Sequence, residues 1–123
     1  MRRRTLLSLL ALMLVSCSGS ASGSDEYQLG EYFINGPTTL AEDADAITVN
    51  NTGEFPHTLV VSTPDGSVIT VTDLIMPGNT VSLPLSLEPG TYQFTCRIVG
   101  QGSDGQIIDH FERGMHITVA IGS

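Results

Sequence analysis

The feature that most restricts the fold of this chain is a series of short β-forming runs from residue 27 onward. Runs rich in Val, Ile, Thr, Leu, Tyr and Phe are broken by Gly, Pro, Asn or Asp roughly every ten residues. No long stretch has a helical period, so the pattern favours an all-β fold. We expect a Greek-key β-sandwich or barrel of about seven to eight short strands. The predicted strands cover residues 28–35, 46–51, 57–63, 67–73, 80–87, 91–97 and 115–121.

The N-terminus has the layout of a secretory signal peptide, with arginines at positions 2–4, an apolar run over residues 6–15 and small residues before Cys17. The apolar run is about ten residues long, well short of the roughly 20 that a transmembrane helix needs. The residues Leu14-Val15-Ser16-Cys17 resemble the bacterial lipobox, in which the cysteine becomes the lipid-modified first residue of the mature protein. The alternative is a plain signal peptide cut nearby, with Cys17 left as a free thiol.

These features predict three segments. A lipoprotein signal peptide covers 1–16, the lipidated Cys17 and a flexible tether rich in Ser and Gly cover 17–26, and one small domain covers 27–123. We therefore expect an extracytoplasmic protein that is lipid-anchored to a bacterial-type membrane, on its periplasmic or cell-surface side.

The charge of the predicted mature chain restricts its partners. Once the three N-terminal arginines are removed, two arginines, no lysine and thirteen acids remain, a net charge of −11. Such a surface repels nucleic acid and favours cationic partners. We expect no nucleic-acid binding, and a basic surface on any protein partner.

Lipidation of Cys17 leaves Cys96 as the only thiol, so it has no partner for an internal disulfide. Side chains alternate between the two faces of a strand, which places Cys96 on the same face as Phe94. The same argument turns Met115 inward and His116 outward in the last strand. His57, Cys96, His110 and Met115 then form a set of two imidazoles, one thiol and one thioether. Two histidines, a cysteine and a weakly bound methionine are typical of a copper site that transfers electrons.

Three segments of this chain resemble the cupredoxins, the small blue copper proteins such as plastocyanin and pseudoazurin. VNNTGEFPHTLVV (Val49 to Val61) looks like the segment that carries the first copper histidine. PGTYQFTC (Pro89 to Cys96) looks like the strand that carries the thiolate, and HFERGM (His110 to Met115) resembles the second histidine and the axial methionine. The resemblance implies one type 1 copper ion bound by His57, Cys96, His110 and Met115. It also implies an electron-transfer protein that acts on a redox partner and is not an enzyme.

Among the departures of this chain from the family pattern, two concern the segments that carry the histidine ligands. Thirteen residues separate Cys96 from His110, where the family usually has only a few, and the family's usual asparagine after the first histidine is Thr58 here. Lengthening the loop from about three to thirteen residues costs only roughly 1.3 kcal/mol in closure entropy. Positioning His110 is the harder demand, and we expect Ile107 and Ile108 to pin this loop to the end of the barrel.

Two other functions fit the same residues. A protein of this fold that captures or delivers copper without redox cycling would keep the ligands, and a metal-free sandwich that serves as a binding module would not need them. His116 is the alternative to His110 as the second imidazole ligand. Neither a Ser/His/Asp triad nor a pair of zinc-type cysteines is evident in the sequence.

Overall fold

A computed structural model describes residues 25–122 of this chain, and Cys17 and the predicted signal peptide lie outside that range. The described part is built from strands, and within it no helical segment has the length and apolar character of a membrane span. The strands are β1 (Asp25–Gly30), β2 (Phe33–Asn35), β3 (Thr39–Leu40), β4 (Ala46–Asn51), β5 (Val60–Ser62), β6 (Val68–Val71), β7 (Thr80–Pro84), β8 (Gly90–Thr95), β9 (Val99–Gln101), β10 (Ile107–Asp109) and β11 (His116–Ile121).

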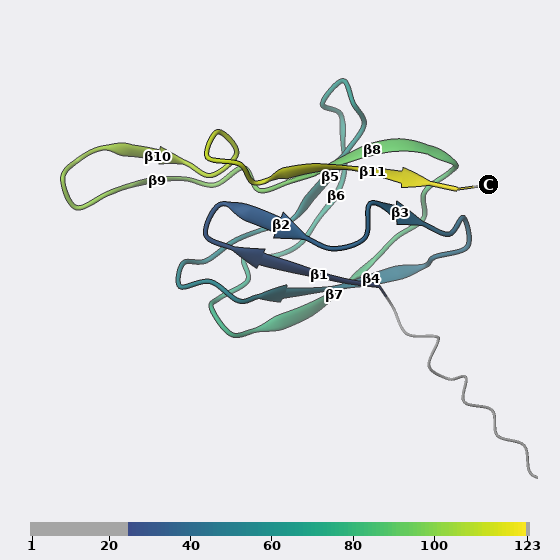
Figure 1. The fold of residues 1–123 in the computed structure, drawn as a ribbon, viewed down its shortest axis with the longest axis horizontal. Helices are drawn as coiled ribbons and strands as arrows, with labels where there is room; N and C mark the ends of the chain where they lie inside the picture. Colours follow the sequence, from purple (N-terminus) through teal and green to yellow (C-terminus); the bar gives the residue numbers. More distant parts are fainter. Residues whose placement is uncertain (1–24, 123) are drawn as a thin grey trace, which may run out of the picture.

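Two sheets face each other in a sandwich (Figure 1). One has the strand order β2-β1-β4-β7 and the other the order β3-β11-β8-β5-β6, while β9 and β10 form a separate hairpin. The pairs β1–β4 and β3–β11 are parallel, and the other pairs are antiparallel. The predicted all-β sandwich is therefore confirmed. Its first strand begins at Asp25, before the predicted start of the domain at residue 27.

The core lies between the sheets and follows the two-residue period of strands. In β4 the buried residues Ile47, Val49 and Asn51 alternate with half-buried ones. Tyr27 of β1 and Phe94 of β8 are fully buried, and their ring centroids are 5.1 Å apart. This contact joins the two sheets near the middle of the sandwich.

Two predicted strands are interrupted in the structure. The predicted strand 28–35 is divided into β1 and β2 by a turn at Glu31 and Tyr32, where Tyr32 has a positive φ of 71°. The predicted strand 57–63 is reduced to β5, and His57 instead forms an isolated bridge with Ile75. Both interruptions lie near the residues predicted to bind metal.

The long segment between Cys96 and His110 is a hairpin, whereas the sequence predicted an irregular loop. β9 and β10 pair in an antiparallel register that joins Ile107 to Gln101 and Asp109 to Val99. The hairpin extends beyond the end of the sandwich (Figure 1). The prediction that Ile107 pins the loop to the barrel was wrong, because Ile107 is 63% exposed. Ile108 is half-buried, which is consistent with an anchoring role. The backbone pairing of β9 with β10, more than the two isoleucine side chains, therefore holds the segment before His110 in place.

The aromatic contact between the sheets yields a prediction for stability. Phe94→Ala leaves a cavity in the core and should lower the free energy of unfolding by about 3–5 kcal/mol. The matched change Phe33→Ala, at a side chain that is 44% exposed, should cost well under half as much. Chemical denaturation of the metal-free protein measures both values. Equal losses would contradict this description of the core.

Candidate metal centre

Cys96 directly follows β8, and the pairing of β8 with β11 holds its backbone in place. Its N–H donates to the carbonyl of Met115 at 3.0 Å, which extends the ladder one step beyond the pair Thr95–His116. The side chain is fully buried, as the alternation with Phe94 predicted. The sulfur atom therefore lies inside the sandwich at the end that carries the hairpin.

His57 is held by two segments that are distant in sequence. Its backbone N–H donates to the carbonyl of Ile75 at 3.1 Å, and its carbonyl accepts the Ile75 N–H at 2.8 Å. Asn51 also fixes the loop before it, because its side-chain amide donates to the carbonyls of Phe55 and Ile75 at 2.9 Å each. His57 is fully buried, so its ring cannot reorient into solvent.

His110 follows the β9–β10 hairpin, and backbone hydrogen bonds fix it on both sides. Its N–H donates to the carbonyl of Ile98 at 3.0 Å, and its carbonyl accepts the N–H of Met115 at 3.1 Å. The ring of Tyr32 packs edge-on against it with the centroids 5.4 Å apart, and the guanidinium of Arg113 lies 5.2 Å from the centre of the Tyr32 ring. His110 is only 5% exposed.

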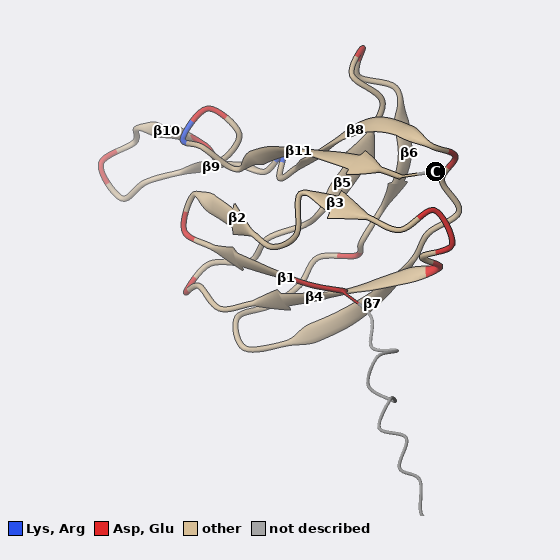
Figure 2. Ribbon diagram, turned by 45° about the vertical axis from the view of Figure 1, so that its right-hand side comes forward, with Lys and Arg blue, Asp and Glu red and all other residues tan. Residues whose placement is uncertain are grey.

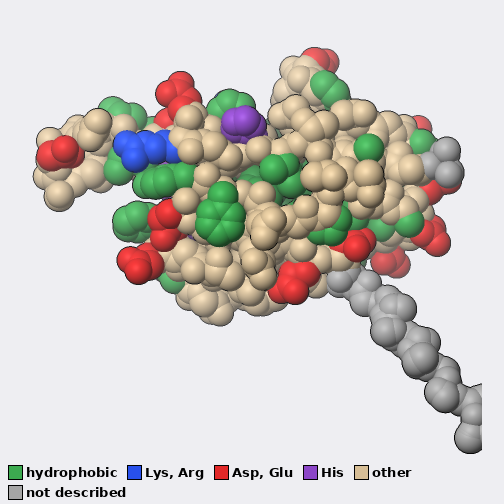
Figure 3. Space-filling model, in the orientation of Figure 1, with side chains coloured by type: hydrophobic (Ala, Val, Ile, Leu, Met, Phe, Trp, Pro, Cys, Tyr) green, Lys and Arg blue, Asp and Glu red, His purple; other side chains and the backbone are tan. Residues whose placement is uncertain are grey.

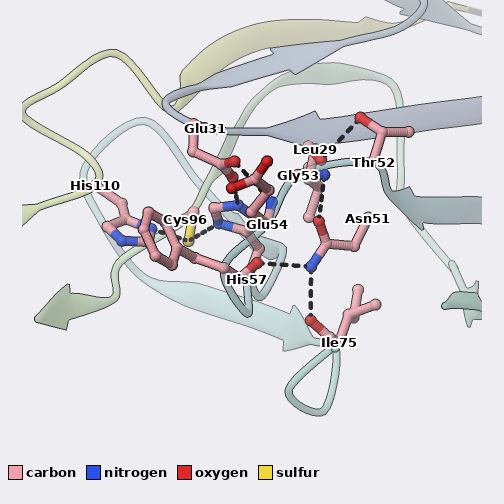
Figure 4. A network of polar contacts seen from close by, with 11 residues as sticks. Leu29, Glu31, Asn51, Thr52, Gly53, Glu54, His57, Ile75, Cys96 and His110 are labelled. Atoms are coloured by element: carbon pink, nitrogen blue, oxygen red, sulfur yellow. Dashed lines mark hydrogen bonds and ion pairs between the residues drawn. The ribbon is translucent and has the colours of Figure 1, made fainter. Parts of the chain in front are cut away.

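These three residues bring their donor atoms together (Figure 4). The Cys96 sulfur is 3.9 Å from Nδ1 of His57 and 3.7 Å from Nδ1 of His110, and the donor atoms of all three lie within 4.8 Å of one another. A divalent first-row metal about 2.0–2.1 Å from nitrogen and 2.3 Å from sulfur, with angles near 110–120°, needs an N–S separation of about 3.6–3.8 Å. Both observed N–S separations agree with one shared ion to within a few tenths of an ångström.

Met115 and His116 lie on opposite sides of the sheet, as strand parity predicted. Met115 is fully buried; its carbonyl accepts the N–H of Cys96, and its N–H donates to the carbonyl of His110. His116 is exposed and packs against the ring of Phe111 at 4.8 Å, away from the three donors. The structure therefore brings His110, and not His116, to Cys96. Axial ligation by the Met115 thioether stays a prediction.

The surroundings of Cys96 favour its ionised form. Burial raises the pKa of the thiol, but a hydrogen bond with His57 and the backbone N–H groups of Thr58 and Ile98 outweigh burial and lower the pKa overall. Thiolate is the form that binds metal. The backbone N–H of Thr58 thus faces the sulfur, while the Asn51 side chain braces the loop before His57.

The pKa values of the two histidines are shifted in opposite directions. Burial lowers the pKa of His110, and the charge of the neighbouring His57 lowers it further, which keeps His110 neutral and able to act as a ligand. Burial also lowers the pKa of His57, but hydrogen bonds and attraction to Cys96 and Glu31 prevail, so its pKa is raised. Without metal, the raised pKa of His57 therefore favours a positively charged ring beside the Cys96 thiolate. A bound metal cation would supply that positive charge instead.

Glu31 was not predicted from the sequence to be part of this site. Its Oε1 lies 3.1 Å from Nε2 of His57, on the side of the ring opposite to Cys96. Burial raises the pKa of Glu31, but the backbone N–H of Glu54, the His57 ring and the backbone N–H of Phe55 lower it overall, so the carboxyl is ionised at neutral pH. Glu31 is one of thirteen acids, and nothing in its local sequence distinguishes it from the others.

Solved structures that resemble this chain share its architecture at low sequence identity. Auracyanin from the photosynthetic bacterium Roseiflexus castenholzii matches with a TM-score of 0.59 and 19% identity, over 80% of this chain and 95% of auracyanin. Rusticyanin from Thiobacillus ferrooxidans matches with a TM-score of 0.57 and 14% identity, over 78% of this chain and 75% of rusticyanin. A purple cupredoxin from Nitrosopumilus maritimus matches with a TM-score of 0.54 and 17% identity, over 79% and 98% of the two chains. No protein-family model and no curated protein sequence matches the chain.

The chain therefore has the cupredoxin fold, which the sequence resemblance implied. At one end of that fold it carries a His-His-Cys-Met set that is typical of one type 1 copper ion.

The position of the two C-terminal histidines yields the second prediction. His110→Gly should abolish the visible absorption of the Cu(II)-loaded protein, with recovery when imidazole fills the vacancy. His116→Ala should leave the spectrum unchanged, because this side chain is exposed on the other face. Loss of the band in His116→Ala alone would transfer the ligand role to His116.

Proposed function

We propose that this protein transfers single electrons at a type 1 copper centre. The observation that carries the proposal is the buried cluster of His57, Cys96 and His110 within a cupredoxin fold. When bound, copper supplies a one-electron couple between Cu(I) and Cu(II). The protein's part is to hold the donors in place while the charge changes.

The donors are well placed for that task. Each of the three comes from a segment held by backbone hydrogen bonds, and all three side chains are buried. Ligands that are fixed by the fold and shielded from water move little between two oxidation states. The same burial argues against a protein that only captures or delivers copper, because exchange of the metal would require the site to open.

The protein is best described as an electron carrier and not as an enzyme. The described residues contain one cluster of metal-binding side chains, and its three donors lie beneath the surface. Electrons can cross such a layer of protein, whereas a substrate would have to reach the metal itself. No substrate is transformed in this proposal.

A redox partner would dock at the end of the fold that carries the hairpin. An apolar groove of about 580 Å³ lies there, with His110 in its lining together with Tyr32, Phe55, Leu74 and Ile108. In Figure 3, hydrophobic and charged side chains gather at this end of the molecule. Acidic positions are spread over many of the loops, whereas the basic positions lie near the hairpin (Figure 2). Within the described residues the basic side chains are Arg97, just before β9, and Arg113, just after β10. With a net charge of −11 after residue 24, the surface favours a partner with a basic docking face.

The lipobox-like residues before Cys17 support attachment of the protein to a membrane. Cys17 lies outside the described residues, and the domain itself begins with β1 at Asp25. We propose that lipidated Cys17 anchors the domain on the extracytoplasmic side of a bacterial-type membrane. A single acyl chain binds membranes only marginally, so a stably anchored protein should carry more than one.

Voltammetry tests the proposed function. The copper-loaded protein should show a reversible one-electron couple. Stoichiometric copper without a reversible couple would favour the copper-handling function instead.

Met115→Gln should keep the copper and lower the reduction potential, because the axial ligand is weak and tunes the centre. Complete loss of copper from Met115→Gln would contradict the axial role.

Salt should slow electron transfer to the physiological partner, since the Debye length shortens to about 8 Å at physiological ionic strength. Asp73→Asn, next to Leu74 of the groove, should slow association and weaken this salt dependence. The matched change Asp43→Asn, near the far end of β11, should do so less. Rates that are flat from low to high salt would contradict a basic docking face.

Cys17→Ala should release the domain into the soluble extracytoplasmic fraction, because it removes the only proposed anchor. Cell fractionation and mass spectrometry of the mature N-terminus provide the measurement, with Ser18→Ala as the control. Recovery of unmodified Cys17 in the mature wild-type protein would contradict lipidation.

A further inference from the structure

The carboxylate of Glu31 is held between the metal-binding histidine and the loop that precedes it (Figure 4). Its Oε1 lies 3.1 Å from Nε2 of His57, and its Oε2 accepts the backbone N–H of Glu54 at 2.6 Å. His57 is fully buried, while the side chain of Glu31 is 29% exposed. The carboxylate thus covers the outer edge of a ring whose other nitrogen faces the Cys96 sulfur.

The backbone around Glu31 is shaped for this contact. Glu31 occupies the turn between β1 and β2 with Tyr32, whose positive φ of 71° is uncommon for a residue with a side chain. Across from it, Gly53 has no side chain, and a Cβ there would clash with Oε1 of Glu31. Gly53 itself is fixed by donating its N–H to the Asn51 side chain at 2.8 Å. Glycine at position 53 is therefore what allows the carboxylate to reach His57.

The contact decides which nitrogen of His57 carries a proton. An ionised carboxylate can only accept hydrogen bonds, so Nε2 must be the protonated nitrogen. In a neutral ring this leaves the lone pair on Nδ1, which points toward Cys96 at 3.9 Å. A metal-binding histidine is typically oriented in this way by a partner on its other nitrogen, and an anionic partner also strengthens the ring as a donor.

We propose that Glu31 is a positioning residue for the metal centre, which selects the Nε2-protonated form of His57 and favours Cu(II) over Cu(I) through that ring. The second half of this inference rests on the proposed copper function. A merely structural ion pair would be worth little at a partly exposed carboxylate and would leave the tautomer of the ring unchanged.

Four variants separate these roles. Glu31→Ala removes the acceptor, and Glu31→Gln keeps an acceptor oxygen without the charge. Gly53→Ala keeps Glu31 and its charge but displaces the carboxylate. Glu54→Ala is the matched control, since it removes a neighbouring exposed acid and keeps the backbone N–H that Glu31 accepts.

The first readout is the tautomer of His57 in the metal-free protein, from the ¹⁵N chemical shifts of its ring, recorded at a pH high enough for the ring to be neutral. Wild type, Glu31→Gln and Glu54→Ala should show Nε2 protonated and Nδ1 not, whereas Glu31→Ala and Gly53→Ala should show a mixture. The second readout is copper binding. Glu31→Ala should weaken Cu(II) binding by roughly 10–100-fold. Each tenfold loss for Cu(II) relative to Cu(I) raises the reduction potential by about 59 mV.

An unchanged tautomer in both Glu31→Ala and Gly53→Ala would overturn the positioning role. A changed tautomer with an unchanged potential would overturn its effect on copper. Should Glu31→Ala not fold, Gly53→Ala decides the same question with the carboxylate present. A wild-type protein that forms no copper site would contradict the proposed function alone, because the tautomer is read without metal.

Discussion

The metal centre depends on the pairing of β8 with β11. This ladder ends where the N–H of Cys96 donates to the carbonyl of Met115, and beyond it the N–H of His110 donates to the carbonyl of Ile98. These two hydrogen bonds fix Cys96 before the hairpin and His110 after it. Both residues are thereby attached to the end of the main sheet. The hairpin can therefore be long without loosening the site.

The length of the segment between Cys96 and His110 was a poor guide to whether His110 could reach the metal site. The entropy cost of closing a loop of thirteen residues is modest. Most of the order of this segment comes from the pairing of β9 with β10, which its glycine-rich sequence did not predict. Among the strands of the described residues, β9 and β10 pair only with each other. Their exposed residues, such as Val99 and Ile107, do not show the burial pattern on which strand prediction relies.

The parts of the site that were predicted correctly follow from local rules. Alternation along a strand is enough to turn Cys96 and Met115 inward and His116 outward. Glu31 follows from no such rule. It reaches His57 from 26 residues away, through a turn that interrupts the predicted first strand and past a glycine that leaves room for it. Contacts of this kind depend on how two loops meet in space.

The metal centre proposed for this protein requires the thiolate of Cys96 to bind copper together with two buried histidines. The most direct test is the visible absorption spectrum of the purified metal-free protein during titration with Cu(II). We expect an intense band that saturates at one equivalent of copper and is absent from Cys96→Ser. Copper that binds without colour, or a band that persists in Cys96→Ser, would contradict it.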